Sequence, residues 1–296
     1  MRIAAIIVTY NRKELLLGCI KAVLGQKGSE AAVIVIDNNS TDGTENAIKK
    51  YSSDKRVIYY NTGSNLGGAG GFQYGIRKGV ELGYDYLWIM DDDCVPSEAA
   101  LDALVSTAKE LNDQFGFLSS KVLWKDGSIC KMNVQRAQLT KNVEDFNIPL
   151  IPVVMASFVS LFVRSEVVRE LGLPIKEFFI WTDDWEFTRR ISKSYSCYVV
   201  TNSEVTHYSK VNIPADVSSD SADRLERFRY LYRNDVVLYR REGLKGFLYE
   251  CARLLFHSTK VVFKAKDHRR KRLGMIWKGT MAGLRFHPKI EYMEGK

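Results

Sequence analysis

The chain has 296 residues, of which 46% are hydrophobic and 26% are charged, and its formal net charge is +8. This is enough apolar material for a sizeable core, in one large domain or in a domain with an appendage. No apolar run reaches the roughly 18 residues that a membrane-spanning helix needs, so the sequence predicts no such helix.

The start of the chain and the cysteines indicate in which cell compartment the protein resides. The apolar run at residues 3–8 is too short for a signal peptide and changes at once to polar Thr9, so we expect a first strand and a cytoplasmic protein. The five cysteines are scattered, at positions 19, 94, 130, 197 and 251. An odd number without paired spacing indicates reduced thiols rather than a disulfide framework or a zinc site.

Short apolar strands alternate with helical patterns through the first third of the chain. The predicted strands are residues 3–8, 32–36, 57–60 and 86–90, and the predicted helices are 13–24, 44–51 and a segment that opens at 65–72 and runs to 82. Alternation of this kind predicts the α/β class, with a doubly wound, mostly parallel sheet.

Three consecutive carboxylates, Asp91, Asp92 and Asp93, follow the fourth predicted strand. Ligands of open α/β sheets bind at the carboxyl ends of the strands. Because adjacent carboxylates repel one another, their position there indicates a cation, and oxygen ligands suit Mg²⁺ or Mn²⁺ that carries a phosphate. The alternative is a solvated acidic turn at the start of the next helix, where Asp is also favourable.

Two more polar segments follow predicted strands. Asp37 lies where a nucleotide-binding sheet places a carboxylate for a base or ribose, although the composition of 37–43 fits a helix-capping turn equally well. The glycines at 67, 68, 70 and 71 would let the backbone approach a phosphate or sugar closely. This loop lacks the Lys-Ser/Thr of a P-loop and does not follow the first strand, so by itself it is weak evidence.

The next stretch predicts a second acidic centre. We expect a helix at 96–111, a strand at 115–124, loops at 127–148, and strands beside a cleft, or an ordinary core hairpin, within 151–163. Aromatic residues then surround Asp183, Asp184 and Glu186. Burial beside aromatic groups raises the pKa of a carboxylate and suits it to proton transfer. A helix at 188–194 and a strand at 197–200 lead to His207, which taken alone is more often structural than a ligand.

The tail differs in charge from the rest of the chain. From Arg224 onward there are 19 Lys and Arg against 7 Asp and Glu, a net charge of +12, which leaves −4 for the remainder. After the polar run at 216–221 the tail reads as helical, with two apolar stripes and a basic cluster at 268–272. That cluster is either a solvated helix face or part of a membrane-surface helix held by anionic lipid. The apolar stripes would otherwise pack on the catalytic domain or on another subunit.

Taken together, these motifs resemble those of a family 2 glycosyltransferase with the GT-A fold, over roughly residues 1–210. They occur in the expected order, which makes the set specific: Thr9-Tyr10-Asn11-Arg12, Asp37-Asn38-Asn39-Ser40, Asn65-Leu66-Gly67, the acid triplet, Asp183-Asp184 and His207. The resemblance implies a catalytic domain at 1–215, with a nucleotide-sugar half at about 1–95 and an acceptor half at about 96–215. A basic helical region at 216–296 would follow.

Within the family, residues 67–72, 90–93 and 181–186 resemble bacterial galactofuranosyltransferases that use UDP-galactofuranose. Those enzymes commonly have Trp directly before the Asp pair, whereas Thr182 follows Trp181 here. The tail is also short, without the large C-terminal domain of polymerising galactan enzymes. Rhamnosyltransferases that use dTDP-rhamnose share much of the pattern, so the resemblance favours UDP-galactofuranose as the donor and keeps dTDP-rhamnose as the alternative.

The resemblance also implies roles for individual residues in an inverting transfer that depends on Mn²⁺ or Mg²⁺. Asp91, Asp93 and His207 would form the metal site, and Asp184, or Asp183 in its place, would be the general base. The implied donor contacts are Thr9, Tyr10, Asn11, Arg12, Asp37, Asn65, Gly67, Gly68, Asp91 and Asp92. The implied acceptor contacts are Trp181, Trp185 and Glu186. The acceptor would be a glycan or a lipid-linked molecule, which places the enzyme at the inner face of the plasma membrane.

Two other classes of function fit the sequence less well than a glycosyltransferase. A non-catalytic nucleotide-sugar-binding protein would have lost the base or a metal ligand, and both are present. A nucleic-acid-binding protein would interleave aromatic and basic residues on a sheet face, and no such face is identifiable, so no nucleic-acid partner is expected.

Overall fold

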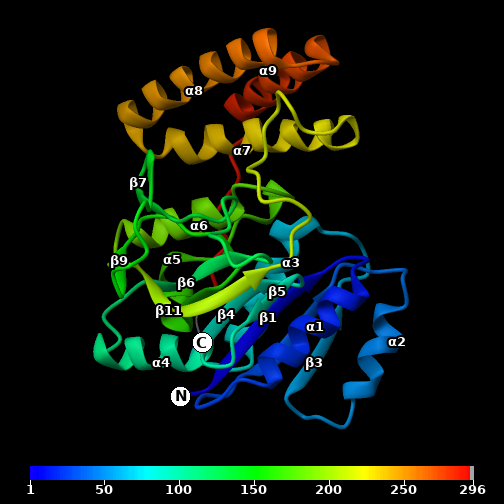
Figure 1. Ribbon diagram of the computed structural model, residues 1–296, viewed down its shortest axis with the longest axis vertical. Helices are drawn as coiled ribbons and strands as arrows, with labels where there is room; N and C mark the ends of the chain where they lie inside the picture. The colour runs from blue at the N-terminus through cyan, green and yellow to red at the C-terminus, as the bar shows by residue number, and fades with distance from the viewer. Residues whose placement is uncertain (294–296) are drawn as a thin grey trace.

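One mixed sheet organises the first 210 residues of the protein, which we describe from a computed structural model covering residues 1–293 (Figure 1). Across those residues the main sheet has nine strands in the order β3-β2-β1-β4-β10-β6-β11-β5, and β9 pairs with β11. The strands are β1 (Ile3–Thr9), β2 (Ala32–Asp37), β3 (Val57–Asn61), β4 (Tyr86–Asp91), β5 (Cys94–Pro96), β6 (Phe117–Trp124), β9 (Leu150–Pro152), β10 (Leu161–Arg164) and β11 (Tyr198–His207). A separate hairpin joins β7 (Arg136–Gln138) and β8 (Lys141–Asn142).

The helices connect and cover these strands. They are α1 (Lys13–Leu24), α2 (Thr44–Ile48), α3 (Gly67–Glu81), α4 (Ala100–Glu110), α5 (Ser165–Leu171), α6 (Asp183–Ser192), α7 (Phe228–Arg240), α8 (Gly243–Lys264) and α9 (Arg269–Arg285). Three 3-10 turns complete the set: η1 (Lys49–Tyr51), η2 (Lys176–Phe178) and η3 (Ala222–Arg227).

The first four strands form the parallel part of the sheet. β1 lies between β2 and β4, and β3 extends the sheet beyond β2, all in parallel. Every residue of β1 is buried, which explains why the strand is an uninterrupted apolar run rather than an alternating one. In the register of these pairs Thr9 lies beside Asp37 and Val8 beside Asp91, so the polar ends of three strands meet at one edge.

The second half of the sheet is mixed. β10 is antiparallel to β4 and β6, whereas β6 and β11 are parallel. The helix predicted from residue 96 begins at Ala100 instead, because Cys94–Pro96 forms β5 against the end of β11. β11 is also longer than predicted, and its register with β6 shifts between Val200 and Glu204. This extension carries His207 to a position opposite Cys94, directly beside the acid triplet.

Helices cover both faces of the sheet, and each face has its own apolar core. On one face the buried side chains of α1 and α4, including Leu16 and Leu104, pack against Trp88. On the other face α3, α5 and α6 bury Ile76, Val167 and Phe187 against the sheet. The two cores fix the strand ends, and with them the site.

The C-terminal helices α7, α8 and α9 form a layer of their own, drawn at the top of Figure 1. They share a small core of buried apolar side chains that includes Phe228, Leu254 and Ile276. α7 faces the catalytic part of the chain, where Val237 packs near Phe178 and Leu238 near Met155. Across residues 1–293, none of the helices is both long and apolar enough to pass through a membrane.

Candidate active site

The acid triplet leaves β4 at the edge where the parallel strands end, and two of its carboxylates are held by Arg12. The guanidinium donates to Asp92 and Asp93, each at 2.6 Å, and the Thr9 hydroxyl donates to Asp92 at 2.7 Å. Asp92 is only 1% exposed. Thr9, Arg12 and Asp92 were expected to contact the donor, but here they bind one another and fix the shape of the edge.

Asp91, Asp93 and His207 form a cluster suited to a metal ion. One ligand atom from each residue lies within 4.8 Å of the others. Asp93 Oδ1 lies 3.2 Å from His207 Nε2 and, among the described residues, this buried oxygen makes no well-formed hydrogen bond. An orphaned buried carboxylate oxygen that faces an imidazole nitrogen fits a divalent cation, and the donor set of two carboxylates and one imidazole suits Mn²⁺ or Mg²⁺.

Asn133 orients His207 for this role. His207 Nδ1 lies 2.8 Å from Asn133 Oδ1, while the Asn133 amide nitrogen donates to Ser157 at 3.1 Å. Because the amide oxygen can only accept, it accepts a hydrogen bond from Nδ1, and the ring is thereby held with Nε2 facing Asp93 Oδ1. Sequence reasoning did not single out Asn133, since it lies in a stretch that lacks periodicity.

The charges of the cluster shift its pKa values in different directions. Burial, followed by the charge of Asp93, raises the pKa of Asp91 to about 7. For Asp93 burial acts upward, but hydrogen bonding and charge from His207 and the charge of Arg12 outweigh it, so its pKa is lowered. Burial acts to lower the pKa of His207, but the interactions with Asp93 and Cys130 and the charge of Asp91 together outweigh it and raise the pKa to about 10. A cation is therefore favoured between Asp93 and His207.

The second acidic centre, Asp183 and Asp184, begins helix α6. Burial raises the pKa of Asp183 to about 7, and burial together with the Asp183 charge raises the pKa of Asp184 well above its usual range. The charge of Asp91 also contributes to the shift at Asp184, so the two centres lie close together. No ion pair of either carboxylate occurs within residues 1–293. Carboxylates left without a cation in a buried site are suited to accept a proton.

The chain reaches this pair through a strained segment. Phe179, Trp181 and Thr182 have φ angles of 66°, 65° and 70°, a left-handed region that costs of order 1–3 kcal/mol for each non-glycine residue. Strain of this kind persists only where neighbouring groups fix the backbone, and it is concentrated at functional sites.

Helix α7 supplies the groups that fix it. Asn234, which is fully buried, donates through its side-chain amide to the carbonyl oxygens of Phe178, Ile180 and Trp181 at 2.9–3.1 Å. The Thr182 hydroxyl donates to Asp235 at 2.7 Å. Sequence analysis placed these residues in the tail and missed them. The available signal was a polar Asn-Asp pair within an otherwise apolar helical stripe.

The residues expected at the acceptor have three different surroundings. Trp181 packs against Phe228, with ring centroids 5.1 Å apart. The ring of Trp185 lies 4.3 Å from the Arg136 guanidinium, which comes from the β7–β8 hairpin. Glu186 is only 1% exposed and pairs with Arg190 and Arg241. The expectation that Glu186 contacts the acceptor is not supported, because its carboxylate is already committed to holding α6 against α7.

The expected donor residues at the other strand ends are mostly engaged in the loops themselves. Asp37 is fully buried and accepts hydrogen bonds from the Ser40 backbone and the Tyr59 hydroxyl. Asn11 bonds the backbone of Thr41, and Asn65 caps the backbone of Gly67. Tyr10 is exposed.

Gly67 and Gly68 differ in what surrounds them. A Cβ atom at Gly67 would lie 2.1 Å from the Phe179 carbonyl oxygen, whereas nothing lies within 4 Å of one at Gly68. Gly67 also has a φ of 72°. The first glycine therefore serves packing against the strained segment, and only the second offers open backbone to a ligand.

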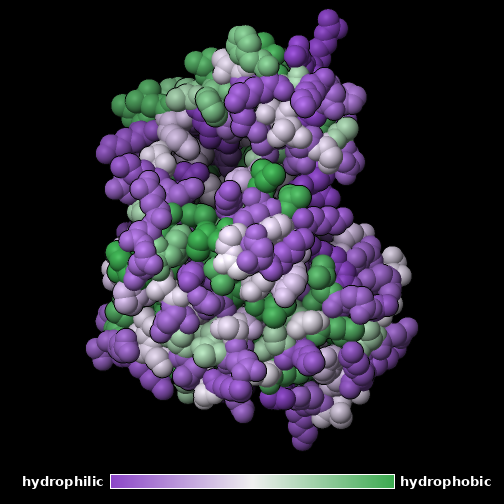
Figure 2. Space-filling view, viewed as in Figure 1, coloured by the Kyte–Doolittle hydropathy of each residue, from purple (hydrophilic) through white to green (hydrophobic). Residues whose placement is uncertain are grey.

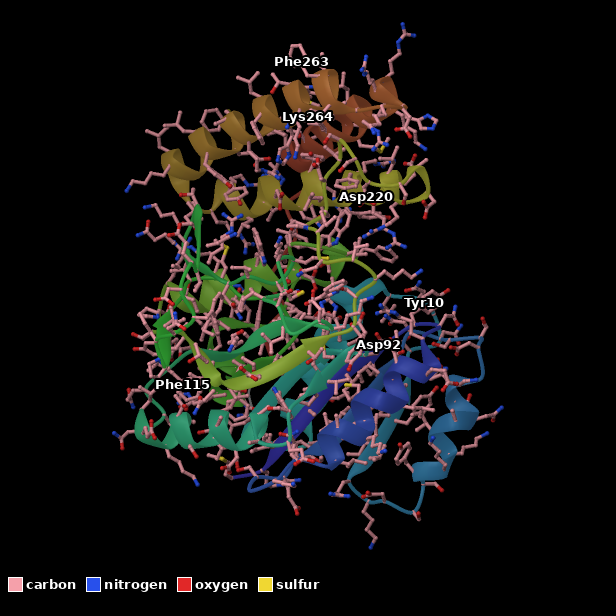
Figure 3. The ribbon with its side chains drawn as sticks, viewed as in Figure 1. Tyr10, Asp92, Phe115, Asp220, Phe263 and Lys264 are labelled. Atoms are coloured by element: carbon pink, nitrogen blue, oxygen red, sulfur yellow. The ribbon has the colours of Figure 1, made fainter. Side chains whose placement is uncertain are left out.

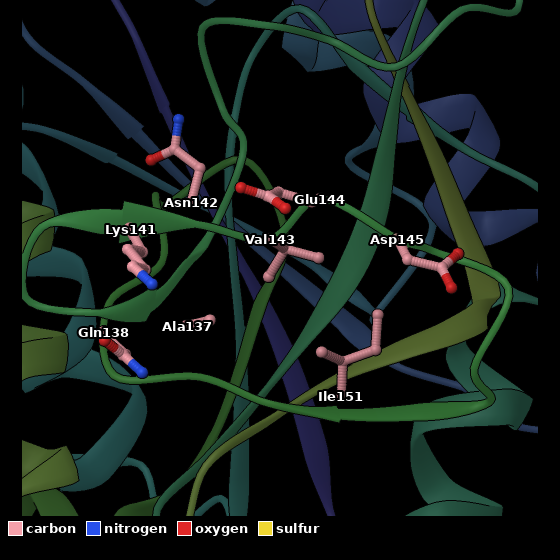
Figure 4. A pocket seen from close by; sticks show the side chains of 8 residues that line it. All are labelled: Ala137, Gln138, Lys141, Asn142, Val143, Glu144, Asp145 and Ile151. Atoms are coloured by element: carbon pink, nitrogen blue, oxygen red, sulfur yellow. The ribbon is translucent and has the colours of Figure 1, made fainter.

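A shallow hollow lies elsewhere on the surface, against the β7–β8 hairpin (Figure 4). Its lining includes Lys141, Glu144 and Asp145, and none of the residues expected at the site takes part. We assign no role to it.

Comparison with known proteins agrees with this geometry. The model of glycosyl transferase family 2 matches residues 4–168, more than half of the chain. A solved structure of GalNAc-T7 with UDP, GalNAc and Mn²⁺ superimposes with a TM-score of 0.59 at 16% identity, covering 83% of this chain and 51% of that one. The fold is thus of the GT-A type, as predicted, and the chain belongs to glycosyl transferase family 2.

Two similar proteins have names that state the sugar or the substrate. The chain is 27% identical over 210 residues to galactofuranosyltransferase GlfT1 of Mycolicibacterium smegmatis, covering 65% of this chain and 66% of that protein. It is 38% identical over 99 residues to an undecaprenyl-phosphate mannosyltransferase of Micrococcus luteus, covering 31% of this chain and 38% of that protein. The chain therefore spans less than two thirds of the length of each of these relatives.

Proposed function

We propose that the protein is an inverting, metal-dependent glycosyltransferase that moves galactofuranose from UDP-galactofuranose to a glycan or lipid-linked acceptor. The observation that carries the proposal is the juxtaposition of two acidic centres with opposite surroundings. One offers Asp91, Asp93 and His207 to a cation, and the other keeps Asp183 and Asp184 free of cations.

In this proposal different residues bind the metal, hold the site in shape and accept the proton. Asp91, Asp93 and His207 would hold a divalent metal, which when bound supplies positive charge to the diphosphate of the departing nucleotide. Arg12 and Asp92 keep the strand edge rigid, and Asn133 keeps Nε2 of His207 turned toward the site. Asp184 takes the proton of the acceptor hydroxyl. The hydroxyl oxygen then attacks the anomeric carbon of the donor sugar, and the bond from that carbon to UDP breaks.

The base and the acceptor contacts follow from the start of α6. Asp184 is preferred over Asp183 as the base because the charge of Asp91, in the first centre, contributes to the raised pKa of Asp184 but not to that of Asp183. Trp181 and Trp185 flank the pair in sequence and present partly exposed aromatic rings for a sugar. Asp183 then positions the acceptor beside the base.

The donor and the acceptor are proposed from the relatives. The GlfT1 relative is named for galactofuranosyl transfer and the M. luteus relative for a polyprenyl-phosphate substrate. The second candidate donor is dTDP-rhamnose, which the insertion of Thr182 between Trp181 and the Asp pair keeps open. An enzyme that uses a lipid-linked acceptor would work at the inner face of the plasma membrane.

A donor screen read by product mass tests the proposal. The purified chain is incubated with Mn²⁺ or Mg²⁺, a lipid-linked acceptor, and UDP-galactofuranose, UDP-galactopyranose or dTDP-rhamnose in turn, with Asp184→Asn as the inactive control. A mass increase with UDP-galactofuranose alone is expected. Transfer from dTDP-rhamnose alone would replace the donor. Metal-dependent UDP binding without transfer from any donor would support the binding-protein alternative.

A further inference from the structure

The outward face of helix α8 is apolar along its whole length. Seven large apolar side chains repeat there at helical spacing and are exposed: Leu244, Phe247, Leu248, Leu255, Phe256, Val262 and Phe263. Phe263 is 80% exposed and Leu244, near the other end, is 72% exposed. The opposite face buries Leu254 and Val261 in the core of the helical layer, so the helix is already packed, and none of the described residues 1–293 covers this second stripe.

The figures show how this stripe, which we call the α8 face, is placed. α8 lies on the side of α7 that is turned away from the sheet (Figure 1). In the space-filling view apolar atoms gather over α8 at the top of the molecule (Figure 2), and the labelled Phe263 points outward there (Figure 3). Soluble proteins rarely expose a continuous apolar strip of this kind unless it binds something.

The charges around the α8 face are of one sign. The exposed cations beside it are Lys245, Lys264, Lys266, Arg269 and Arg270, and no ion pair of theirs occurs within residues 1–293. The acids of the segment are neutralised, since Glu250 is buried against Arg253 and Asp267 pairs with Arg272.

Only part of the basic cluster expected at residues 268–272 is free to bind a partner. Arg272 is 2% exposed and bonds the Asp267 carboxylate and three backbone carbonyls, and Lys271 pairs with Glu226. These two cations support the fold. Apart from Lys245 at the start of α8, the free cations named above lie at the end of α8 and the start of α9, next to the exposed apolar side chains.

We propose that the α8 face is an interfacial helix that lies in the surface of an anionic phospholipid bilayer. An apolar strip with free cations at its ends, one near the start of α8 and four where α8 passes into α9, matches the acyl boundary and headgroups of such a surface, which helices of this type occupy without spanning it. A second copy of the chain fits less well, because each copy would bring free cations to the contact and no free acid of α8 to pair with them. The proposal extends the proposed function by bringing the enzyme to the phase that holds a lipid-linked acceptor.

Vesicle co-sedimentation of the full chain tests the proposal. Binding is expected to vesicles that contain phosphatidylglycerol, to be weak with phosphatidylcholine alone, and to fall as salt rises. Phe256→Ser and Phe263→Ser should each weaken binding about 10-fold or more, since each removes a large apolar side chain from the boundary. Lys264, Lys266, Arg269 and Arg270 changed together to Ser should cost about 5-fold per charge.

Matched controls keep the outcome interpretable. Ile148→Ser removes an exposed apolar side chain outside α8 and should leave binding unchanged, and thermal unfolding checks that every variant is folded. Binding that survives the Phe variants would overturn the proposal. So would a lipid-free dimer, seen by sedimentation velocity, that Phe263→Ser dissociates. No sugar nucleotide is used, so failure here is distinct from failure of the donor screen.

Discussion

The two acidic centres of this protein contain the same kind of residue but differ in whether cationic side chains stand beside them. Asp93, at the end of β4, is buried beside Arg12 and His207, and its pKa is lowered. Asp183, which is buried, and Asp184, which is half-buried, begin α6 without an ion pair in the described residues, and their pKa values are raised. Burial disfavours an ionised carboxylate in both places and also raises the pKa of Asp91, so the neighbouring cations explain why the pKa of Asp93 is lowered instead.

The supports of the two centres also come from different parts of the chain. Thr9, Arg12 and Asn133 position the first centre from within the sheet and its loops. The second depends on Asn234 and Asp235 of α7, and Asp235 in turn pairs with Arg253 of α8 at 2.7 Å. The helical layer that carries the α8 face is thus bonded to the backbone that leads into Asp183 and Asp184.

Removal of the proton acceptor is expected to have the largest effect. Asp184→Asn keeps the shape of the side chain but cannot take a proton, so turnover should fall about 10²-fold or more while UDP affinity persists. Steady-state kinetics and calorimetric UDP binding measure the two effects. If Asp183→Asn causes the large loss and Asp184→Asn does not, the roles of the two residues are exchanged.

Removal of a proposed metal ligand should affect the binding of UDP. Asp93→Ala deletes the carboxylate between Arg12 and His207, and metal-dependent UDP binding should fall about 100-fold or to nothing. Calorimetry with and without Mn²⁺ measures this, and circular dichroism confirms the fold. The matched control is Asp42→Ala, a carboxylate that bonds the loop of Lys13 and Thr44 outside the cluster. Unchanged UDP binding in Asp93→Ala would refute the metal assignment.

Loss of the support from α7 should have a smaller, mixed effect. Asn234→Ala leaves three carbonyl oxygens of the strained segment without their donor, so we expect about 1–3 kcal/mol lower stability and about 10-fold lower turnover. Donor affinity should be unchanged, which separates this effect from general loss of fold. Arg229→Ala, an exposed change on the same helix, is the control. Full turnover in folded Asn234→Ala would show that the segment holds its shape unaided.

The pH dependence should give the mildest signature, at most about 10-fold per pH unit. Turnover should rise with pH through about 7 and beyond, because the pKa values of Asp183 and Asp184 are raised and the base must be ionised. The contribution of Asp183 and Asp184 to stability falls as pH rises. The folded state binds more protons than the unfolded chain above about pH 4, so stability is lost as pH rises from there toward the raised pKa values.

A double variant isolates that contribution. Asp183→Asn combined with Asp184→Asn should be more stable than the natural chain at pH 8 and equally stable near pH 4. Thermal unfolding at the two pH values gives the comparison. An equal difference at both pH values would mean that the two carboxylates do not titrate as described.

Much of the fold was accessible from the sequence because parallel strands buried on both faces are continuous apolar runs. Residues 13–24 form α1 as predicted, and the strands at 3–8, 32–36 and 57–60 differ from the structure by one residue. The second half was harder to predict. Polar Thr201, Asn202 and Ser203 interrupt the apolar pattern of β11, and β5 has only three residues, so their pairing was not visible.

The sequence by itself determined the order of the elements and the places where carboxylates leave the strands, since both follow from local apolar periodicity and from residue type. The tertiary structure decided what each carboxylate does. Arg12 reaches Asp92 and Asp93 across 80 and 81 residues, and Asn234 reaches the carbonyl of Trp181 across 53. The pKa of a buried acid depends on which charges and donors stand within a few ångströms, and the chain brings those groups together only when it folds.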